Sequence, residues 1–218
     1  IVTLKYGTSG EVEWVKRHDS HSHLSDQPLE IICDAWSNIY VSGLTSGFPY
    51  NYFLIKYNGA GNEQWIINEG ENSINALTVD TRGNPYVTGS LTKKYSPKGV
   101  LLWKALRAAQ NAKAIASDDS GNVYVAGSIW SDLVTIKYDS TGAEKWVACF
   151  SGVEQRYQNV GIALDHRNNV YVTVNTANDE NWVAHTIKYN PAGTMLWSVN
   201  HPGNRGSTIA LDDSGNIY

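Results

Sequence analysis

The chain has 218 residues, a net charge of −4 and only 17% charged side chains, and it contains 8 Trp and 13 Tyr. These aromatic side chains favour β-strands. The small negative charge and the absence of a Lys or Arg cluster argue against a nucleic-acid partner. No apolar run is as long as a membrane-spanning segment, so we expect no membrane span.

The predicted strands follow a regular order along the chain. Residues 1–17 begin with IVTLKY, which matches LVTIKY at 133–138, and continue through a Gly-containing turn to Trp14. Four complete units follow, each with an apolar strand A, a strand B of the form Asn-x-Tyr-Val, a strand C ending in Lys-Tyr or a variant, and a strand D with a Trp. The chain ends with a fifth strand A and the start of a strand B, STIALDDSGNIY. Residues 1–17 therefore correspond to strands C and D alone.

Two phrases define the repeat. Asp-x-x-[Gly/Ser/Asn]-Asn-x-Tyr occurs five times, and its tyrosines are 46, 38, 47 and 47 residues apart: Tyr40, Tyr86, Tyr124, Tyr171 and Tyr218. Lys-Tyr-x-x-x-Gly-x-x-x-Trp also occurs five times and ends at Trp14, Trp65, Trp103, Trp146 and Trp197. Four strands at this period are typical of the blades of a propeller.

The repeat predicts an all-β fold, a β-propeller of four-stranded antiparallel blades in a single domain over 1–218. Small residues at most strand A positions that precede the repeat Asp suit the crowded axis of a toroid. Because the two terminal half units are complementary, we expect five blades, with the closing blade shared between the N- and C-terminal strands. The alternative is that further repeats continue the ring beyond both ends.

The combination of TIKYDSTGAEKWVA and GIALDHRNNVYVT resembles SBBP repeats, a bacterial β-propeller repeat family found mostly in large secreted or surface proteins. The resemblance covers essentially the whole chain. It implies an extracellular or cell-surface location and offers no catalytic residues. The family name denotes seven blades, whereas this sequence shows five units.

The repeated residues are interpreted first as structure. We expect the five acids Asp34, Asp80, Asp118, Asp165 and Asp212 to cap the A to B turns, with possible Lys pairs, because one carboxylate per turn is too few ligands for calcium. The five motif Trp are expected at equivalent, largely buried positions. Cys33 and Cys149 are expected to be buried thiols, with a disulfide between them as the alternative.

Function in repeat scaffolds depends on what differs between repeats. Because strands A and C run the same way, the variable B to C and D to A loops share one face. Aromatic and polar side chains collect there and suit a ligand with polar and apolar faces, such as a sugar. The predicted ligand-binding residues are Tyr50, Tyr52, Trp130, Asp132, Arg156, Tyr157, Asn181 and Trp182, with ordinary inter-blade packing as the alternative.

The sequence favours a binding module over an enzyme. A glycosidase needs converging carboxylates, yet only Glu30 lies near the start of an innermost strand. We expect a non-catalytic, lectin-like module for a carbohydrate, with a protein-interaction scaffold as the alternative and no cofactor. His18, His21 and His23 share one loop whose spacing can bind a transition metal, but a solvated loop is the expectation, so no metal site is assigned.

Overall fold

The computed structural model describes residues 1–19, 26–45, 51–70, 73–105, 111–129, 132–151, 158–178, 181–203 and 208–218. Strands joined by turns make up the architecture of these ranges. No helix within them is both long and apolar enough to cross a membrane.

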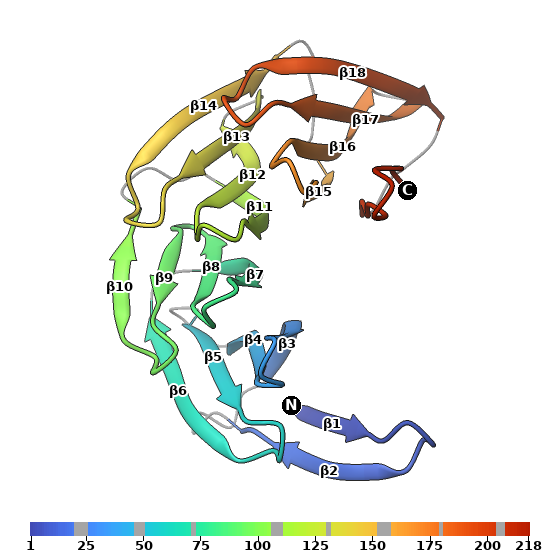
Figure 1. Cartoon of the computed structure of the whole chain (residues 1–218). Helices are drawn as coiled ribbons and strands as arrows, with labels where there is room; N and C mark the ends of the chain where they lie inside the picture. The colour runs from blue at the N-terminus through green and yellow to red at the C-terminus, as the bar shows by residue number, and fades with distance from the viewer. Residues whose placement is uncertain are drawn as a thin grey trace.

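Four four-stranded antiparallel sheets follow one another along an open arc (Figure 1). Blade 1 consists of β3 (Asp26–Cys33), β4 (Ile39–Thr45), β5 (Asn51–Tyr57) and β6 (Glu63–Gly70). Blade 2 consists of β7 (Ile74–Val79), β8 (Pro85–Gly89), β9 (Lys93–Tyr95) and β10 (Leu101–Lys104). Blade 3 consists of β11 (Asn111–Ser117), β12 (Val123–Ile129), β13 (Asp132–Tyr138) and β14 (Glu144–Phe150). Blade 4 consists of β15 (Gln158–Leu164), β16 (Val170–Asn178), β17 (Asn181–Tyr189) and β18 (Met195–Pro202).

The first strand of each blade lies on the inner side of the arc and the last strand lies on its rim (Figure 1). β7 contacts both β3 and β11, and β11 contacts β15, so the inner strands of successive blades are neighbours. The prediction of an all-β propeller of four-stranded antiparallel blades is confirmed.

The hydrophobic core lies between blades. Between blades 1 and 2, for example, Tyr40 and Leu54 pack against Leu77 and Val87. Similar clusters join blade 2 to blade 3 and blade 3 to blade 4. A blade therefore buries its faces mainly against its neighbours, as expected when one sheet is too small to hold a core of its own.

The motif Trp forms a joint between blades. Trp103 of blade 2 donates its indole Nε1–H to the Ser140 carbonyl oxygen of blade 3 at 3.1 Å. Its ring lies against Gly142, which has a φ of 88°, and a Cβ at that glycine would be 2.7 Å from the ring. The same hydrogen bond recurs at 3.0 to 3.2 Å for Trp14, Trp65 and Trp146. The equivalent positions are confirmed, and in all five Trp most of the surface is buried while part stays exposed.

Both ends of the described chain are half blades. β1 (Val2–Tyr6) and β2 (Val12–Arg17) form a two-stranded sheet, the N-terminal half blade, and pack on blade 1. Residues 208–218, the C-terminal half blade, contain the bridge Leu211–Ile217. The two halves share no sheet, and they lie on opposite sides of the opening in the arc (Figure 1). The expected closing blade is therefore not formed among the described residues, because the arc of four blades leaves the two half blades apart.

The expectation for the cysteines is wrong. Cys33 in β3 and Cys149 in β14 are both exposed, and neither forms a disulfide. Apolar strand context suggested burial, but β14 is the last strand of its blade and exposes alternate residues. β3 is the inner strand of the blade next to the N-terminal half blade, which supplies no inner strand beside it.

We predict that Trp103→Ala lowers the free energy of unfolding by about 3 kcal/mol, near the lower end for aromatic truncation, because the joint to Gly142 is lost. Trp36→Ala is the matched control, since Trp36 is 58% exposed and should change stability by only about 0.5 kcal/mol. Urea titration measures both. Equal losses in the two variants would contradict the role of the motif Trp.

Candidate functional site

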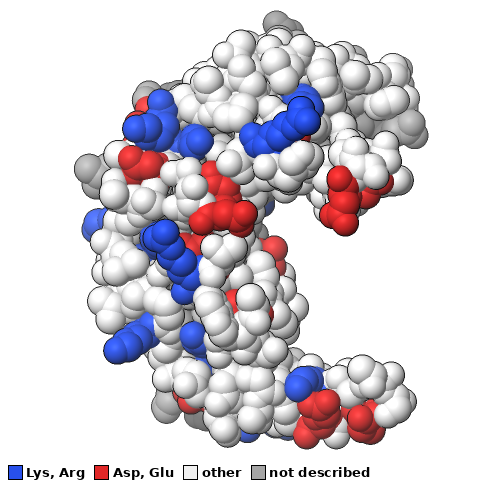
Figure 2. Space-filling view, viewed as in Figure 1, with Lys and Arg blue, Asp and Glu red and all other residues white. Residues whose placement is uncertain are grey.

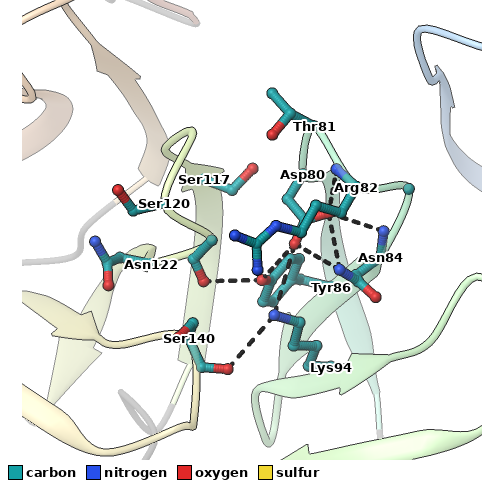
Figure 3. Close-up of polar contacts among 12 residues, drawn as sticks. Asp80, Thr81, Arg82, Asn84, Tyr86, Lys94, Ser117, Ser120, Asn122 and Ser140 are labelled. Carbon is teal, nitrogen blue, oxygen red and sulfur yellow. Dashed lines mark hydrogen bonds and ion pairs between the residues drawn. The ribbon is translucent and has the colours of Figure 1, made fainter.

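The repeat acids close the turns between strands A and B. Asp80 Oδ1 accepts the backbone amides of Arg82 and Asn84 at 3.0 and 2.9 Å, and Oδ2 accepts the Asn84 side-chain amide at 2.8 Å (Figure 3). The same two kinds of bond recur at the other four acids, Asp34, Asp118, Asp165 and Asp212. Their predicted role as turn caps is confirmed.

The motif Tyr of blades 1 and 2 connects its turn to the next blade. The buried Tyr86 hydroxyl lies 3.0 Å from Asp80 Oδ2 and 2.9 Å from the Gly121 carbonyl oxygen of blade 3, so its proton is shared between two acceptors. Burial, reinforced by the charge of Asp80, raises the pKa of Tyr86. The hydroxyl therefore stays protonated and remains a donor at neutral pH.

The motif Lys completes this arrangement. Lys94 Nζ lies 4.8 Å from the centre of the Tyr86 ring and 3.6 Å from Asp80 Oδ2, and it donates to the Ser140 carbonyl oxygen at 3.4 Å (Figure 3). Three further motif lysines lie 4.7 to 5.1 Å from the equivalent Tyr rings: Lys56, Lys137 and Lys188. On the face seen in Figure 2, positive and negative side chains are interspersed along the arc. The repeated charges are thus used to hold turns and blades together.

The predicted ligand-binding residues are described only in part. Tyr50, Trp130, Arg156 and Tyr157 lie outside the described residues. Asp132 opens β13 and pairs with Ile129, and Asn181 opens β17 and pairs with Asn178. Asp132 and Trp182 are both partly exposed. The structure therefore places Asp132, Asn181 and Trp182 at the same ends of the B to C hairpins in blades 3 and 4.

Tyr52 differs from the other predicted residues because it is fully buried. Its hydroxyl lies 2.7 Å from the Tyr95 hydroxyl and accepts a hydrogen bond from Lys93 Nζ at 3.1 Å. Glu69 pairs with Lys93 and accepts the Tyr95 hydroxyl at 2.8 Å. Tyr52 is thus part of a polar cluster between blades 1 and 2 and presents no exposed ring for stacking.

Sequence reasoning missed this cluster, although the repeat contained a signal. The residue before each motif Lys is apolar in β1, blade 1, blade 3 and blade 4, namely Leu4, Ile55, Ile136 and Ile187, but it is Lys93 in blade 2. Burial by itself would raise the pKa of Glu69, but hydrogen bonds from Lys93 and Tyr95 outweigh burial and lower it. Glu69 therefore stays ionised at neutral pH.

A second non-repeated cluster lies between blades 3 and 4. The buried His185 ring lies 2.8 Å from Thr176 Oγ1 through Nε2 and 2.7 Å from Asn200 Oδ1 through Nδ1. The Phe150 ring of blade 3 packs edge-on against it at 5.8 Å. Both ring nitrogens are therefore in use, which favours a structural role for this histidine.

The loop that carries His18, His21 and His23 lies mainly outside the described residues, because His21 and His23 are not among them. His18 packs beside the Phe53 ring at 5.1 Å. Within the described ranges, no three metal-ligating side chains come together. The Glu30 carboxylate accepts a hydrogen bond from the Leu77 backbone amide at 2.5 Å. It therefore bonds to β7, the inner strand of the adjacent blade.

The fold and the turn network define a β-propeller built from one repeat. The SBBP family model, described as a beta-propeller repeat, matches residues 110–133, a range that includes β12 of blade 3. No curated protein matches the chain significantly in sequence.

Solved structures with the same fold have little sequence similarity to the chain. The Dos1 propeller is 14% identical with a TM-score of 0.65, over 97% of this chain and 54% of that one. A protein of unknown function from Bacteroides caccae is 13% identical with a TM-score of 0.58, over 89% of this chain and 73% of that one. The WD40 domain of Neurospora crassa Pan2 is 10% identical with a TM-score of 0.51, over 85% of this chain and 69% of that one. These likenesses show the propeller fold, and the chain spans about half of the Dos1 propeller.

We predict that the domain loses stability in acid. Burial alone would raise the pKa values of Asp80 and Asp165, but their turn hydrogen bonds outweigh burial and lower them. A carboxylate whose pKa is lower in the folded state stabilises the fold at pH values above the unfolded pKa of about 3.9. This stabilisation is lost as the pH falls through the folded pKa. Urea titrations between neutral pH and about pH 3 should show this loss. Asp80→Asn should be less stable at neutral pH and lose less on acidification; an unchanged pH dependence would contradict the assignment.

We predict strong coupling between Glu69 and Lys93. Glu69→Gln leaves the buried Lys93 without its counter-charge and should cost about 3 kcal/mol. The double variant Glu69→Leu with Lys93→Ile places in blade 2 the isoleucine found in the other complete blades and should recover most of that loss. The wild type, Glu69→Leu, Lys93→Ile and the double variant form a double-mutant cycle, and urea titration of all four measures the coupling. Additive losses would show that the pair does not act as a unit.

Proposed function

We propose that this propeller is a non-catalytic binding and scaffold module that holds a protein partner on the face of the B to C and D to A loops. The observation that carries the proposal is a difference in role between the repeated residues and the residues that vary between blades. The repeated side chains form turn caps and blade joints, as shown by Asp80, Tyr86 and Lys94. Residues at the ends of the B to C hairpins differ from blade to blade, so specificity can be encoded there.

A protein ligand is favoured over the carbohydrate expected from sequence. Tyr52, one of the aromatic rings assigned to a sugar platform, lies in the interior. The described residues on this face include the partly exposed Trp182 beside the longer hairpin of blade 4, and Asp132 on blade 3. A partly exposed Trp and a carboxylate suit the anchors of a protein interface. The extracellular or cell-surface location stays a prediction from the family resemblance.

The test screens the immobilised chain against a displayed random-peptide library and a glycan array. We expect selected peptides to bind, and Trp182→Ala to weaken binding about tenfold or more, as for an interface anchor. Trp36→Ala removes an equally large exposed ring from an A to B turn and should leave binding unchanged. Glycan binding that depends on Trp182 would identify a carbohydrate module instead. Peptide binding unaffected by Trp182→Ala and Asp132→Ala would place the site elsewhere.

A further inference from the structure

The C to D hairpin of blade 2 departs from the other copies of the repeat. It carries apolar residues at three consecutive positions, Val100, Leu101 and Leu102, directly before the motif Trp. Lysines stand on both sides of this run, at Lys98 and Lys104. Small or apolar residues hold the two lysine positions in the other copies: Ser9, Ala60, Thr141 and Ala192, and Val15, Ile66, Val147 and Ser198. Blade 2 therefore combines an apolar run with a basic residue at each end.

This part of blade 2 lies open to solvent. Val100, Leu101 and Leu102 are 60%, 43% and 51% exposed, and Lys98 and Lys104 are exposed as well. A single exposed apolar side chain is ordinary on a protein surface, but three in succession are unfavourable unless another molecule covers them. The run is therefore a candidate contact surface.

The same residues lie at the edge of a sheet. β10 pairs with β9 along one edge, and among the described residues no further strand of that sheet lies along its other edge, on the outer rim (Figure 1). Such an edge presents backbone N–H and C=O groups to which an extended chain can pair. In blades 1 and 3, charged side chains at the equivalent positions oppose strand addition: Glu63, Glu144 and Lys145. Blade 2 has Leu101 and Leu102 there and lacks this protection.

We propose that β10 binds an extended segment of a partner protein, apolar in its middle and acidic at both ends, which adds a fifth strand to blade 2. Main-chain hydrogen bonds to β10 supply affinity, and the run from Val100 to Leu102 packs against the apolar middle. Lys98 and Lys104 attract the carboxylates at the two ends. This surface is on the rim, so it is separate from the site proposed on the B to C and D to A loops.

The lysines favour such a segment over a second copy of this chain. Antiparallel pairing of two β10 edges would bring the basic ends of both copies together. Like charges opposite each other on neighbouring strands are destabilising. Acidic residues placed beside Lys98 and Lys104 instead form opposite-charge pairs across the two strands.

Blade 4 provides a matched control. Leu196 occupies the repeat position of Leu102, is 52% exposed and belongs to β18, the last strand of its blade. The two lysine positions hold Ala192 and Ser198 in this blade. Leu196→Arg therefore makes the same change on a rim strand without the basic ends.

A displayed random-peptide library tests the proposal. The library is first depleted on the Leu102→Arg variant and then selected on the wild-type chain. We expect the selected peptides to carry an apolar stretch with Asp or Glu at both ends. In fluorescence anisotropy titrations, Leu102→Arg should weaken their binding about tenfold or more, whereas Leu196→Arg and Trp182→Ala should leave it unchanged. The Trp182 variant separates this surface from the one on the variable loops.

Two further measurements test the charge complementarity and the strand pairing. Lys98→Glu with Lys104→Glu should weaken the selected peptide and strengthen a version in which its acids are replaced by lysine. Because alternate amides of a strand point to opposite edges, two versions of the peptide are N-methylated on odd or on even residues. One version should lose binding and the other should keep it.

Circular dichroism confirms that each variant is folded. The proposal is overturned if no selected peptide distinguishes the wild type from Leu102→Arg, or if both N-methylated versions bind. It is also overturned if the charge reversal leaves peptide binding unchanged. Sedimentation in which the wild type associates and Leu102→Arg does not would identify a second copy as the occupant instead.

Discussion

The contact on which the rest of this structure depends is the joint between one blade and the next. A four-stranded sheet of this size cannot enclose a core by itself, so each blade depends on its neighbour to cover its apolar face. The indole of one blade lies on a left-handed glycine of the next and donates to a nearby carbonyl oxygen. Glycine is required there because a side chain would occupy the space of the ring. The repeated spacing of Lys, Tyr, Gly and Trp in the sequence reflects the geometry of this joint.

The polar side chains of the joint are buried and therefore need hydrogen-bond partners. Asp80 would be costly to bury alone, but two backbone amides, an asparagine side chain and a tyrosine hydroxyl satisfy its oxygens. Tyr86 and Lys94 then carry the contact into blade 3. Every charged member has partners, so the repeated acids are engaged in structural contacts. This is the physical reason for assigning function to residues that vary between blades.

Blade 2 shows how one repeat can depart from the others without loss of the fold. Lys93 replaces an isoleucine in the inter-blade core, and Glu69, Tyr52 and Tyr95 supply its partners. A buried ion pair adds little stability compared with apolar packing, but losing one partner is costly. The cluster therefore makes the contact between blades 1 and 2 chemically different from the others. We expect it to favour the correct pairing of these two blades among similar repeats.

The repeat phrases by themselves determined the strand order, the four-stranded blades, the turn caps and the equivalence of the motif Trp, because turn chemistry and strand alternation are local properties. Only the tertiary structure decided what depends on neighbours. In that structure the two half blades lie apart, and Cys33 and Cys149 are exposed. Tyr52 lies in the interior beside Lys93. The sequence pattern could not settle these points, since the burial of a strand residue depends on which sheet covers it and on the curvature summed over successive blades.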